Sequence, residues 1–385
     1  MPDGHSPNLT ATTVSHLNEV EKDAWDALAN PPGQAYYPFG AWDFLEAMES
    51  SGSVRPETGW GPQHLLLHEG DKLVGAMPLY LKGHSRGEFV FDHAWADAYT
   101  RAGGQYYPKM LGAIPFTPAT GPRLFAQTAE HKKGLATAAA QVTAQMQLSS
   151  LHITFPTAQD RDVLEDAGFL IRKGQQYRFE DQGFGDWQGF LDALASRKRK
   201  DLRKERERIK QDGLEIDWIT GSEITEAHLD DFWVFYQDTG MRKWGSPYLT
   251  RTAFSLLAER MADKILLILA RRDDRYIAGA FNMIGGDTLF GRYWGCTEHV
   301  PFLHFELCYY QAIDYALAHG LRFVDGGAQG EHKIARGYVP VATSSAHYIT
   351  DPGFHDAVAR YCREEASHVD SDLAYLSDFT PFKKS

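Results

Sequence analysis

The apolar and polar positions of the chain form two successive series of elements with the same order. In the first series, the spacing of apolar residues predicts helices at 14–28, 41–49, 129–147 and 160–167, and strands at 64–68, 73–81, 88–91, 151–155 and 175–179. The second series has helices at 226–237, 251–261 and 304–319, and strands at 265–271, 276–284, 288–294 and 321–324. Each series runs from helices through antiparallel strands to a crossover helix and a further strand. This order predicts an α+β protein with two mixed, mostly antiparallel sheets.

The length of the chain also favours two domains. It has 385 residues, which is more than one hydrophobic core usually organises. Hydrophobic residues make up 43% of the chain and aromatic residues 13%, which is enough for packed cores and argues against disorder. We therefore expect domains at 1–185 and 213–385, with a basic connecting helix at 186–212 between them.

Charge and cysteine content narrow the expected environment. The net charge of −12 disfavours nonspecific binding to nucleic acid or an anionic membrane, and so argues against DNA as a partner. Three scattered cysteines match neither a disulfide framework nor a zinc ribbon, which favours a reducing compartment. No signal peptide is recognisable, and the most apolar run, 265–270, is too short to span a bilayer. These features predict a cytoplasmic protein without membrane insertion and leave its oligomeric state open.

One segment departs strongly from the acidic average. Residues 196–210 carry nine Lys or Arg and three acidic residues, and their spacing predicts a helix. A solvated helix that bridges the two halves is one interpretation. The other is a strip that binds the phosphates of a donor such as tRNA, a nucleotide-linked substrate or a coenzyme. The phosphate-binding candidates are Arg197, Lys198, Arg199 and Lys200.

Aromatic and charged residues gather between residues 91 and 109 around a pair of glycines. The glycines and prolines there predict an irregular, functional loop region. An aromatic wall with a few charged groups suits a small-molecule pocket, whereas an ordinary aromatic core with polar ends has the same composition. The substrate-binding candidates in this stretch are Trp95, Asp97, Tyr106, Tyr107 and Lys109.

Two shorter stretches contain further substrate-binding candidates. The loop predicted at 239–248 carries Arg242 and Trp244, which either clamp an anion or carboxylate or lie on a plain surface loop. The alternating strand predicted at 342–349 includes His347, which is either a site residue or a core histidine with satisfied hydrogen bonds.

A glycine-rich turn follows the strand predicted at 321–324 and offers the groups that acyl transfer to an amine needs. Such a turn delivers its polar side chains to the end of the sheet, where ligands commonly bind. A base must take a proton from the attacking nitrogen, and donors must hold the developing oxyanion. A purely structural turn is the alternative. The candidates are Asp325, Gln329 and His332 as catalytic residues, and Glu331, Lys333 and Arg336 as substrate-binding residues, with the two cations holding a carboxylate or phosphate.

Several common motifs are missing from the sequence. It contains no Gly-x-Ser-x-Gly elbow, no Walker loop and no His-Glu-x-x-His pair. His299, His304, Glu306 and His332 follow no standard spacing of metal ligands, so we expect no metal site.

Three segments carry a resemblance to a known family: FDHAWADAYTRAGGQYYPKMLGAIPFTPATGPRL, HFELCYYQAIDYALAHGLRFVDGGAQGEHKIARGYVP and TSSAH. Together they resemble the bacterial FemAB-like predicted N-acyltransferases, relatives of the peptidoglycan FemABX peptidyltransferases within the GNAT superfamily. The resemblance extends from Trp42 onward and implies two tandem GNAT (acyl-CoA N-acyltransferase-like) domains. The segment DGGAQGEH is also similar to part of the leucyl/phenylalanyl-tRNA-protein transferases, which implies that Asp325, Gln329 and His332 lie in or beside the reaction centre.

One departure from the superfamily bears on the donor. Acetyl-CoA enzymes carry a glycine-rich loop before the crossover helix, whose amides hold the pyrophosphate, whereas the matching stretch 296–304 contains no glycine. Together with the basic segment, this favours aminoacyl-tRNA over acyl-CoA as donor co-substrate. The leading hypothesis is an N-acyl- or aminoacyltransferase, related to peptidoglycan, with a groove between its halves that takes a small-molecule or peptide amine acceptor. A CoA-dependent N-acetyltransferase and a noncatalytic module that binds peptidoglycan precursors are the alternatives.

Overall fold

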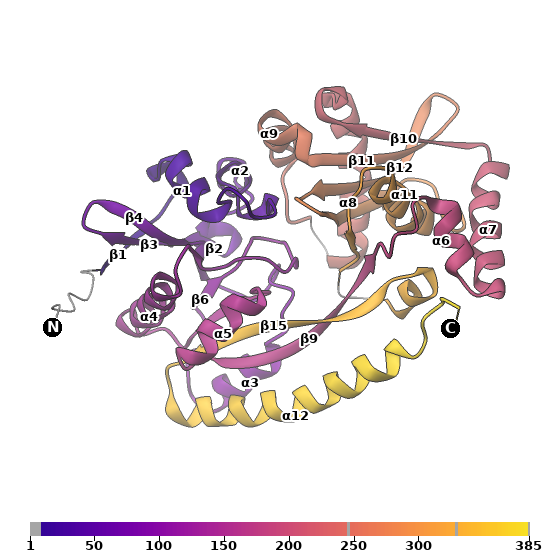
Figure 1. Ribbon diagram of the computed structural model, residues 1–385. Helices are drawn as coiled ribbons and strands as arrows, with labels where there is room; N and C mark the ends of the chain where they lie inside the picture. The colour runs from indigo at the N-terminus through magenta and orange to yellow at the C-terminus, as the bar shows by residue number, and fades with distance from the viewer. Residues whose placement is uncertain (1–8, 245–246, 328–329, 384–385) are drawn as a thin grey trace. The chain divides into compact units, whose positions relative to one another are not determined.

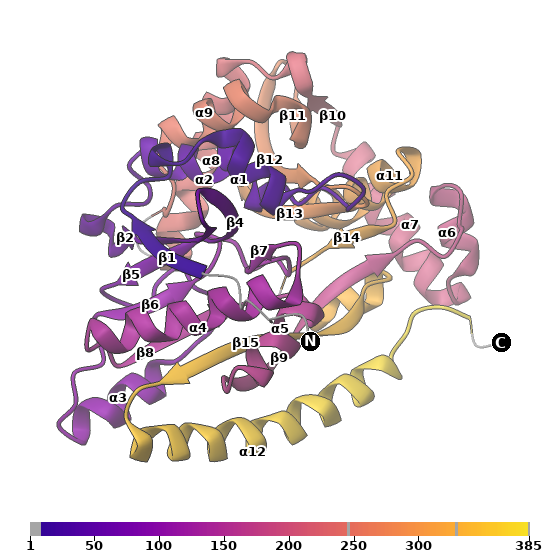
Figure 2. The same ribbon diagram turned by 60° about the vertical axis from the view of Figure 1, so that its left-hand side comes forward.

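The computed structural model shows helices combined with mixed sheets (Figure 1 and Figure 2). It describes residues 9–244, 247–327 and 330–383. Within these residues, no helix is both long enough and apolar enough to span a membrane.

The chain forms two compact units. The first comprises residues 1–174 and 343–368, and the second comprises residues 175–342 and 369–385. This division differs from the predicted boundaries at 185 and 213, because the segment 343–368 returns to the first unit. The return is made by a strand that pairs antiparallel with a strand of the first unit, from Ser345 opposite Thr154 to Ile349 opposite Ser150.

The first unit contains a four-stranded sheet of order β1-β3-β4-β7 and a second run of strands of order β15-β8-β6-β5-β2. Strands β6 and β8 pair parallel, and the other neighbours pair antiparallel. Its elements are β1 (Leu9–Val14), α1 (Lys22–Ala29), α2 (Trp42–Ser50), β2 (Trp60–Pro62), β3 (His64–Glu69), β4 (Lys72–Met77), β5 (Leu79–Lys82), α3 (His93–Arg101), β6 (Lys109–Gly112), β7 (Phe125–Ala126), α4 (Ala129–Gln145), β8 (Ser150–Thr154) and α5 (Ala158–Asp166).

Helix α4 is the crossover helix of the first unit, since it connects the parallel strands β6 and β8. Alternation along β8 points Leu151 and Ile153 to the face that α4 covers, where they join a core cluster with Leu135 and Ala139. The residues between them, such as His152, point to the opposite face. The apolar layer under α4 therefore follows directly from the period-2 pattern of the strand.

The second unit contains strands of order β10-β11-β12-β13-β14-β9, of which β13 and β14 pair parallel and the others antiparallel. Strand β9 (Leu170–Glu180) enters this unit, and β15 (Val339–Ile349) and α12 (Pro352–Ser377) each run through both units. The other elements are α6 (Trp187–Ala193), α7 (Ser196–Gln211), β10 (Leu214–Thr220), α8 (Glu226–Trp244), α9 (Arg251–Met261), β11 (Ile265–Arg272), β12 (Arg275–Ile284), β13 (Thr288–Cys296), α10 (Leu303–Phe305), a π-helical turn (Glu306–Tyr310), α11 (Gln311–Ala318), β14 (Phe323–Asp325) and a 3-10 helix (Glu331–Arg336).

The sequence of strand β11 is apolar without alternation because both faces of the strand are buried. Leu266 and Ile268 point into the core cluster that includes residues of α11. Leu269 points to the other face, where its side chain lies near Gly279 together with Phe232 of α8. Helices thus cover both faces of this part of the sheet.

Helix α8 approaches β13 closely at Gly295. A Cβ added to this glycine would lie 1.9 Å from the carbonyl oxygen of Phe235. Only glycine allows the helix and the strand to pack at this distance.

The crossover helix of the second unit is interrupted near its start. The predicted helix 304–319 consists of α10, the π-helical turn and α11, and it connects the parallel strands β13 and β14. π-helical turns inside helices occur frequently at functional sites, because the extra residue changes which side chains share a face.

Several local predictions differ from the structure. The strand predicted at 73–81 is divided into β4 and β5, which belong to different runs of strands. Residues 14–21 are not α-helical, since Val14 ends β1, which pairs with β3, residues 17–19 form a short 3-10 helix, and α1 begins only at Lys22. No strand forms at 88–91. The stretch expected to be irregular contains α3, in which Trp95 and Tyr99 recur at helical spacing.

Candidate functional site

The predicted catalytic turn follows β14. Asp325 is the last residue of this strand and is half-buried, and its Oδ1 accepts a hydrogen bond from the Gly327 amide at 2.9 Å. Burial raises the pKa of the Asp325 carboxyl, although the Gly327 amide opposes this rise. The side chain of Lys333 holds the turn in place, because Nζ donates to the carbonyl oxygens of Gly326 and Gly327.

His332 lies on the 3-10 helix after this turn, with an exposed imidazole. Its Nε2 is 3.1 Å from the hydroxyl oxygen of Tyr309, and its ring centroid is 5.5 Å from that of Phe305. Desolvation by its neighbours and the positive charges of Arg336 and Lys333 lower the pKa of His332. The imidazole is therefore neutral at pH 7 and can accept a proton.

Gly330 provides the space for this ring. Its φ of +107° is a backbone conformation that residues with a side chain rarely adopt. A Cβ at this position would lie 2.3 Å from Cε1 of His332. Any other residue at position 330 would therefore displace the imidazole.

Arg336 connects the 3-10 helix to α7. Its Nη1 donates to the carbonyl oxygen of His332 at 2.9 Å, and its Nη2 donates to the Glu205 carboxylate, also at 2.9 Å. The guanidinium lies 3.5 Å from the centroid of the Phe305 ring, which is cation–π geometry. These contacts fix the backbone that carries His332.

A pocket of about 380 Å³ lies where the loop after β13 enters α10. Thr239 of α8, Trp294 and Cys296 of β13, and His304 and Phe305 of α10 contribute to its lining. The ring centroids of His304 and Phe305 are 6.5 and 5.5 Å from that of His332, so the wall of the pocket reaches the imidazole. The pocket occupies the place where the glycine-rich loop of acetyl-CoA enzymes was expected and not found.

The predicted basic helix is confirmed as α7, and it belongs to the second unit. Leu202 and Ile209 anchor its buried side. Arg206 also points inward, where it forms ion pairs with Glu306 at 3.0 Å and Asp314 at 2.7 Å. Part of the positive charge of α7 is thus used to attach the helix to the crossover helix.

The four predicted phosphate-binding residues lie in the first turns of α7 and differ in exposure. Arg197 and Lys200 are exposed, and Lys198 is half-buried. Arg199 forms an ion pair with Asp192 at 3.0 Å. Among these four, Arg197 and Lys200 are therefore the most accessible to a ligand.

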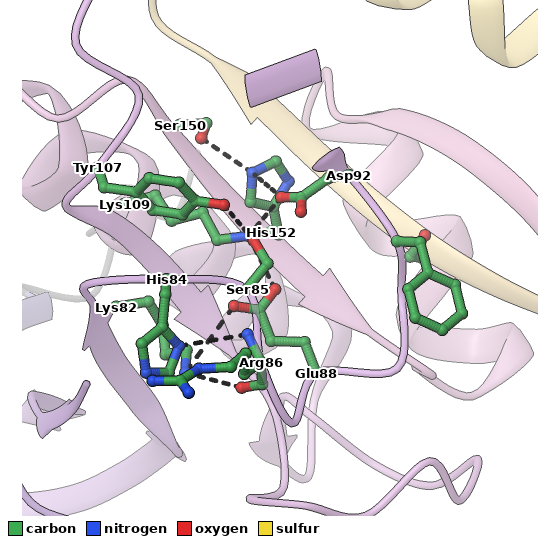
Figure 3. A network of polar contacts seen from close by, with 12 residues as sticks. Lys82, His84, Ser85, Arg86, Glu88, Asp92, Tyr107, Lys109, Ser150 and His152 are labelled. Carbon is green, nitrogen blue, oxygen red and sulfur yellow. Dashed lines mark hydrogen bonds and ion pairs between the residues drawn. The ribbon is translucent and has the colours of Figure 1, made fainter. Parts of the chain in front are cut away.

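In the first unit, charged and polar side chains form a largely buried network (Figure 3). It lies on the face of the strands opposite the apolar core cluster that packs under α4. The register explains why they meet: Lys82 of β5 lies opposite Lys109 of β6, and His152 of β8 lies opposite His347 of β15. Because side chains directly opposite each other in a sheet share a face, these residues form two close pairs, one of lysines and one of histidines.

Lys109 is at the centre of this network and is completely buried. Its Nζ donates to Ser85 and Glu88, each at 2.8 Å, and forms an ion pair with Asp92 (Figure 3). The hydroxyl of Tyr106 donates to Asp92 at 2.7 Å. The lysine charge is thereby balanced inside the protein.

The network perturbs the pKa of each of its charged members. Burial alone would lower the pKa of Lys109, but the carboxylates of Glu88 and Asp92 outweigh burial and raise it. Burial raises the pKa of Glu88 to about 6 and lowers that of Lys82 to about 7. For Asp92, the positive charge of Lys109 overcomes burial and lowers the pKa.

Two neutral histidines extend the network. Burial lowers the pKa of His152 to about 3 and that of His347 well below its ordinary value. Their Nδ1 atoms are 2.6 Å apart, so one ring donates and the other accepts. The Trp95 ring packs edge-on against His347, with centroids 4.8 Å apart. Trp95, Tyr106, Lys109 and His347, four of the predicted substrate-binding residues, thus lie together in the first unit.

The remaining predicted site residues differ in their exposure and in whether the structure describes them. Tyr107 is half-buried and shares a hydrogen bond with Ser85, whereas Asp97 is exposed on α3. Other candidates lie outside the described side chains or residues. Of these, Arg242 and Trp244 belong to the last turn of α8, so the loop predicted at 239–248 is wrong for residues 239–244, where the helix continues. Glu331 begins the 3-10 helix, and Gln329 lies outside the described residues. The predicted substrate roles, and the predicted groove, stay predictions.

Sequence reasoning missed several residues that contact the predicted ones. Around His332 these residues are Phe305 and Tyr309. Their spacing in the predicted helix 304–319 indicated only an apolar helix face. In the first unit they are Lys82, Glu88 and His152. A signal was present in the strands, since His152 is a polar residue within an otherwise apolar segment and Lys82 ends another.

Among the described side chains, no cluster of three or more His, Cys, Asp or Glu residues is arranged to hold a metal ion.

Each unit contains a parallel strand pair joined by a crossover helix within an otherwise mostly antiparallel sheet. This topology defines an α+β protein with two tandem GNAT-like domains, as the sequence predicted, and the fold of FemX agrees with it. The chain belongs to the FemAB-like family, described as peptidoglycan biosynthesis/recognition, which it matches over residues 16–384.

Solved structures with similar folds include FemX, which is 13% identical, with a TM-score of 0.56 over 88% of this chain and 98% of that chain. L-PGS from Bacillus licheniformis is 10% identical, with a TM-score of 0.51 over 86% of this chain and 98% of that chain. A conserved protein of unknown function from Bacteroides thetaiotaomicron is 10% identical, with a TM-score of 0.53 over 88% and 99%. At these identities the similarities establish the fold alone. No curated protein matches the chain in sequence.

Proposed function

We propose that this protein is an N-acyltransferase of bacterial peptidoglycan metabolism, which transfers an aminoacyl group from aminoacyl-tRNA to the amine of a small molecule or peptide in the cytoplasm. The observation that carries the proposal is a neutral, exposed His332 beside a pocket at the entry to the crossover helix. Membership of the FemAB-like family supports the link to peptidoglycan. FemX and L-PGS share the fold that the proposed reaction uses.

In the proposed reaction the acceptor amine attacks the carbonyl carbon of the donor ester. A C–N bond forms, and the C–O bond to the ribose breaks. When Nε2 of His332 donates to Tyr309, its Nδ1 is free to take the proton of the attacking amine and pass it to the leaving ribose oxygen. Asp325 accepts from the Gly327 amide through Oδ1, and its Oδ2 orients the amine.

The first test of this mechanism is Asp325→Asn, which keeps the shape of the side chain and removes its charge. We expect turnover to fall about 10²–10³-fold with an unchanged thermal midpoint, as for other groups that act mainly in the transition state. Transfer of a labelled amino acid from aminoacyl-tRNA to a peptidoglycan precursor peptide measures this effect. Asp287→Asn, at the opposite end of the parallel strand pair, is the matched control and should keep wild-type activity. Wild-type turnover of Asp325→Asn would contradict the assigned role.

The donor is tested through the exposed residues of α7. We propose that Arg197 and Lys200 bind phosphates of the tRNA, because both are exposed and lie on adjacent turns of the helix. The double change Arg197→Glu and Lys200→Glu should weaken tRNA binding and reduce the slope of log K against log salt by about one to two.

The control for this test reverses two exposed lysines of the first unit, Lys72→Glu and Lys133→Glu, which alters the net charge equally. Unchanged tRNA affinity of the α7 variant across a salt series would leave α7 as a solvated helix. Efficient transfer from acyl-CoA, without tRNA, would replace the proposed donor and leave the acyl transfer itself standing.

A further inference from the structure

The pocket beside His332 has walls suited to a small organic group. Trp294, Val300, Phe302 and Phe305 supply apolar or aromatic surface. Its volume of about 380 Å³ is near the lower end of the range of small-molecule pockets, roughly 300–1,000 Å³. A group of this size is one residue or one ring, not a whole coenzyme or nucleic acid.

Thr239 gives this pocket a polar group without a partner. Its side chain is 8% exposed and lines the pocket from α8. Its buried hydroxyl oxygen has no hydrogen-bond partner among the residues that the structure describes. A buried hydroxyl left unpaired costs about 1–3 kcal/mol, so a ligand that pairs with it after the Thr239 side chain rotates toward the pocket recovers this energy.

The charged group in the lining does not favour a charged ligand. Glu298 lines the pocket, but its carboxylate is ion-paired with Arg272 and lies 3.5 Å from Arg275. A cationic ligand would therefore compete with two arginines for this carboxylate, and an anionic ligand finds no Lys or Arg among the described residues of the lining. The lining thus offers little to a ligand of either charge.

We propose that this pocket recognises the side chain of the transferred aminoacyl group, and that it prefers an uncharged, largely apolar side chain with one polar atom that bonds to Thr239. This inference rests on the proposed function. Its geometric basis is that Phe305 is shared: the ring lines the pocket and its centroid lies 5.5 Å from that of His332. A side chain bound in the pocket thus holds its own carbonyl carbon near the base.

Ligand binding can be measured without any transfer reaction, because Cys296 lines the pocket. The half-buried Cys308 serves as an internal reference, since it too is outside any disulfide but does not belong to the lining. The wild-type chain is alkylated with iodoacetamide in the presence of N-acetyl amino-acid amides, and modification of each cysteine is followed by peptide mass spectrometry. The amides form isosteric pairs, threonine with valine and tyrosine with phenylalanine, and charged lysine and aspartate amides are included.

We expect at least one hydroxyl-bearing amide to protect Cys296, and not Cys308, at a concentration about tenfold lower than its apolar isostere. This factor corresponds to one net hydrogen bond. The charged amides should give no protection. Absence of protection by every amide, equal protection of both cysteines, or equal protection by the charged amides would overturn the inference. Isothermal titration calorimetry with the same amides gives an independent measurement of binding.

Variants of Thr239 test the polar contact itself. Thr239→Val should remove the preference for the hydroxyl-bearing amide, whereas Thr239→Ser should keep it. Thr143→Val is the matched control, because Thr143 is also buried, in the first unit, and its hydroxyl already donates to the Ala139 carbonyl oxygen. A preference that survives in Thr239→Val would overturn the assignment of this residue.

A parallel transfer assay separates this inference from the function on which it rests. If transfer occurs at the same rate with every aminoacyl group, the pocket inference fails and the proposed function stands. If Cys296 is protected selectively but no donor supports transfer, the pocket is a binding site and the proposed transferase fails.

Discussion

His332→Ala is expected to lower turnover about 10²–10⁴-fold, the usual contribution of a general base. The imidazole is neutral and exposed, and Tyr309 orients it through Nε2. The substitution removes the proton acceptor but leaves the backbone contact between Arg336 and the carbonyl oxygen of residue 332. We therefore expect the fold to persist, which circular dichroism and the thermal midpoint will show.

The pH dependence of turnover also tests whether His332 is the base. A base must be unprotonated, and desolvation together with Arg336 and Lys333 lowers the pKa of His332. The acid limb of the wild-type profile should therefore lie below the ordinary histidine value of about 6.5.

In Tyr309→Phe the orienting hydroxyl is lost, and we expect roughly a tenfold fall in turnover.

The matched control is His319→Ala, which removes a histidine of the same unit whose ring stacks on Tyr315 with centroids 3.9 Å apart. It should keep turnover within about twofold of wild type, since surface changes have small effects. Wild-type turnover in His332→Ala, or an acid limb that persists unchanged in that variant, would exclude His332 as the base.

Lys109→Met is expected to destabilise the first unit by about 3–5 kcal/mol, because it leaves buried carboxylates without their cation. Lys109 is completely buried and its ammonium contacts Glu88 and Asp92. Methionine matches the length of the aliphatic stem, so the loss comes mainly from the missing charge. Urea unfolding measures the free energy of unfolding of each variant.

The double variant Lys109→Met with Asp92→Asn separates charge from packing. Removal of one unpaired carboxylate should recover part of the lost stability, whereas a packing defect would only become worse. The control Lys22→Met breaks the Lys22–Asp43 ion pair, in which the lysine side chain is 46% exposed, and should cost no more than about 1 kcal/mol. A loss below about 1 kcal/mol in Lys109→Met would contradict the structural role of the network.

The sequence by itself determined the elements whose pattern is local. The buried run of β11, the amphipathic crossover helices and the basic helix α7 all follow from the spacing of residues within one segment. The glycine-rich turn after β14 also identified Asp325 and His332 as candidates, because strand ends and glycines are visible in a single stretch of sequence. Local errors arose where propensity was ambiguous, as in α3 and in β1.

Only the tertiary structure decided which distant groups meet. The Tyr309–His332 contact joins the crossover helix to the 3-10 helix, and Thr239 of α8 lines the same pocket as Phe305 of α10. The lysine network depends on strand register, and a shift of one residue would turn Lys109 to the opposite face. Spacing along the chain encodes which face of an element is apolar. The partners of a buried charge or hydroxyl are set by the pairing of strands and the packing of helices, which no single segment contains.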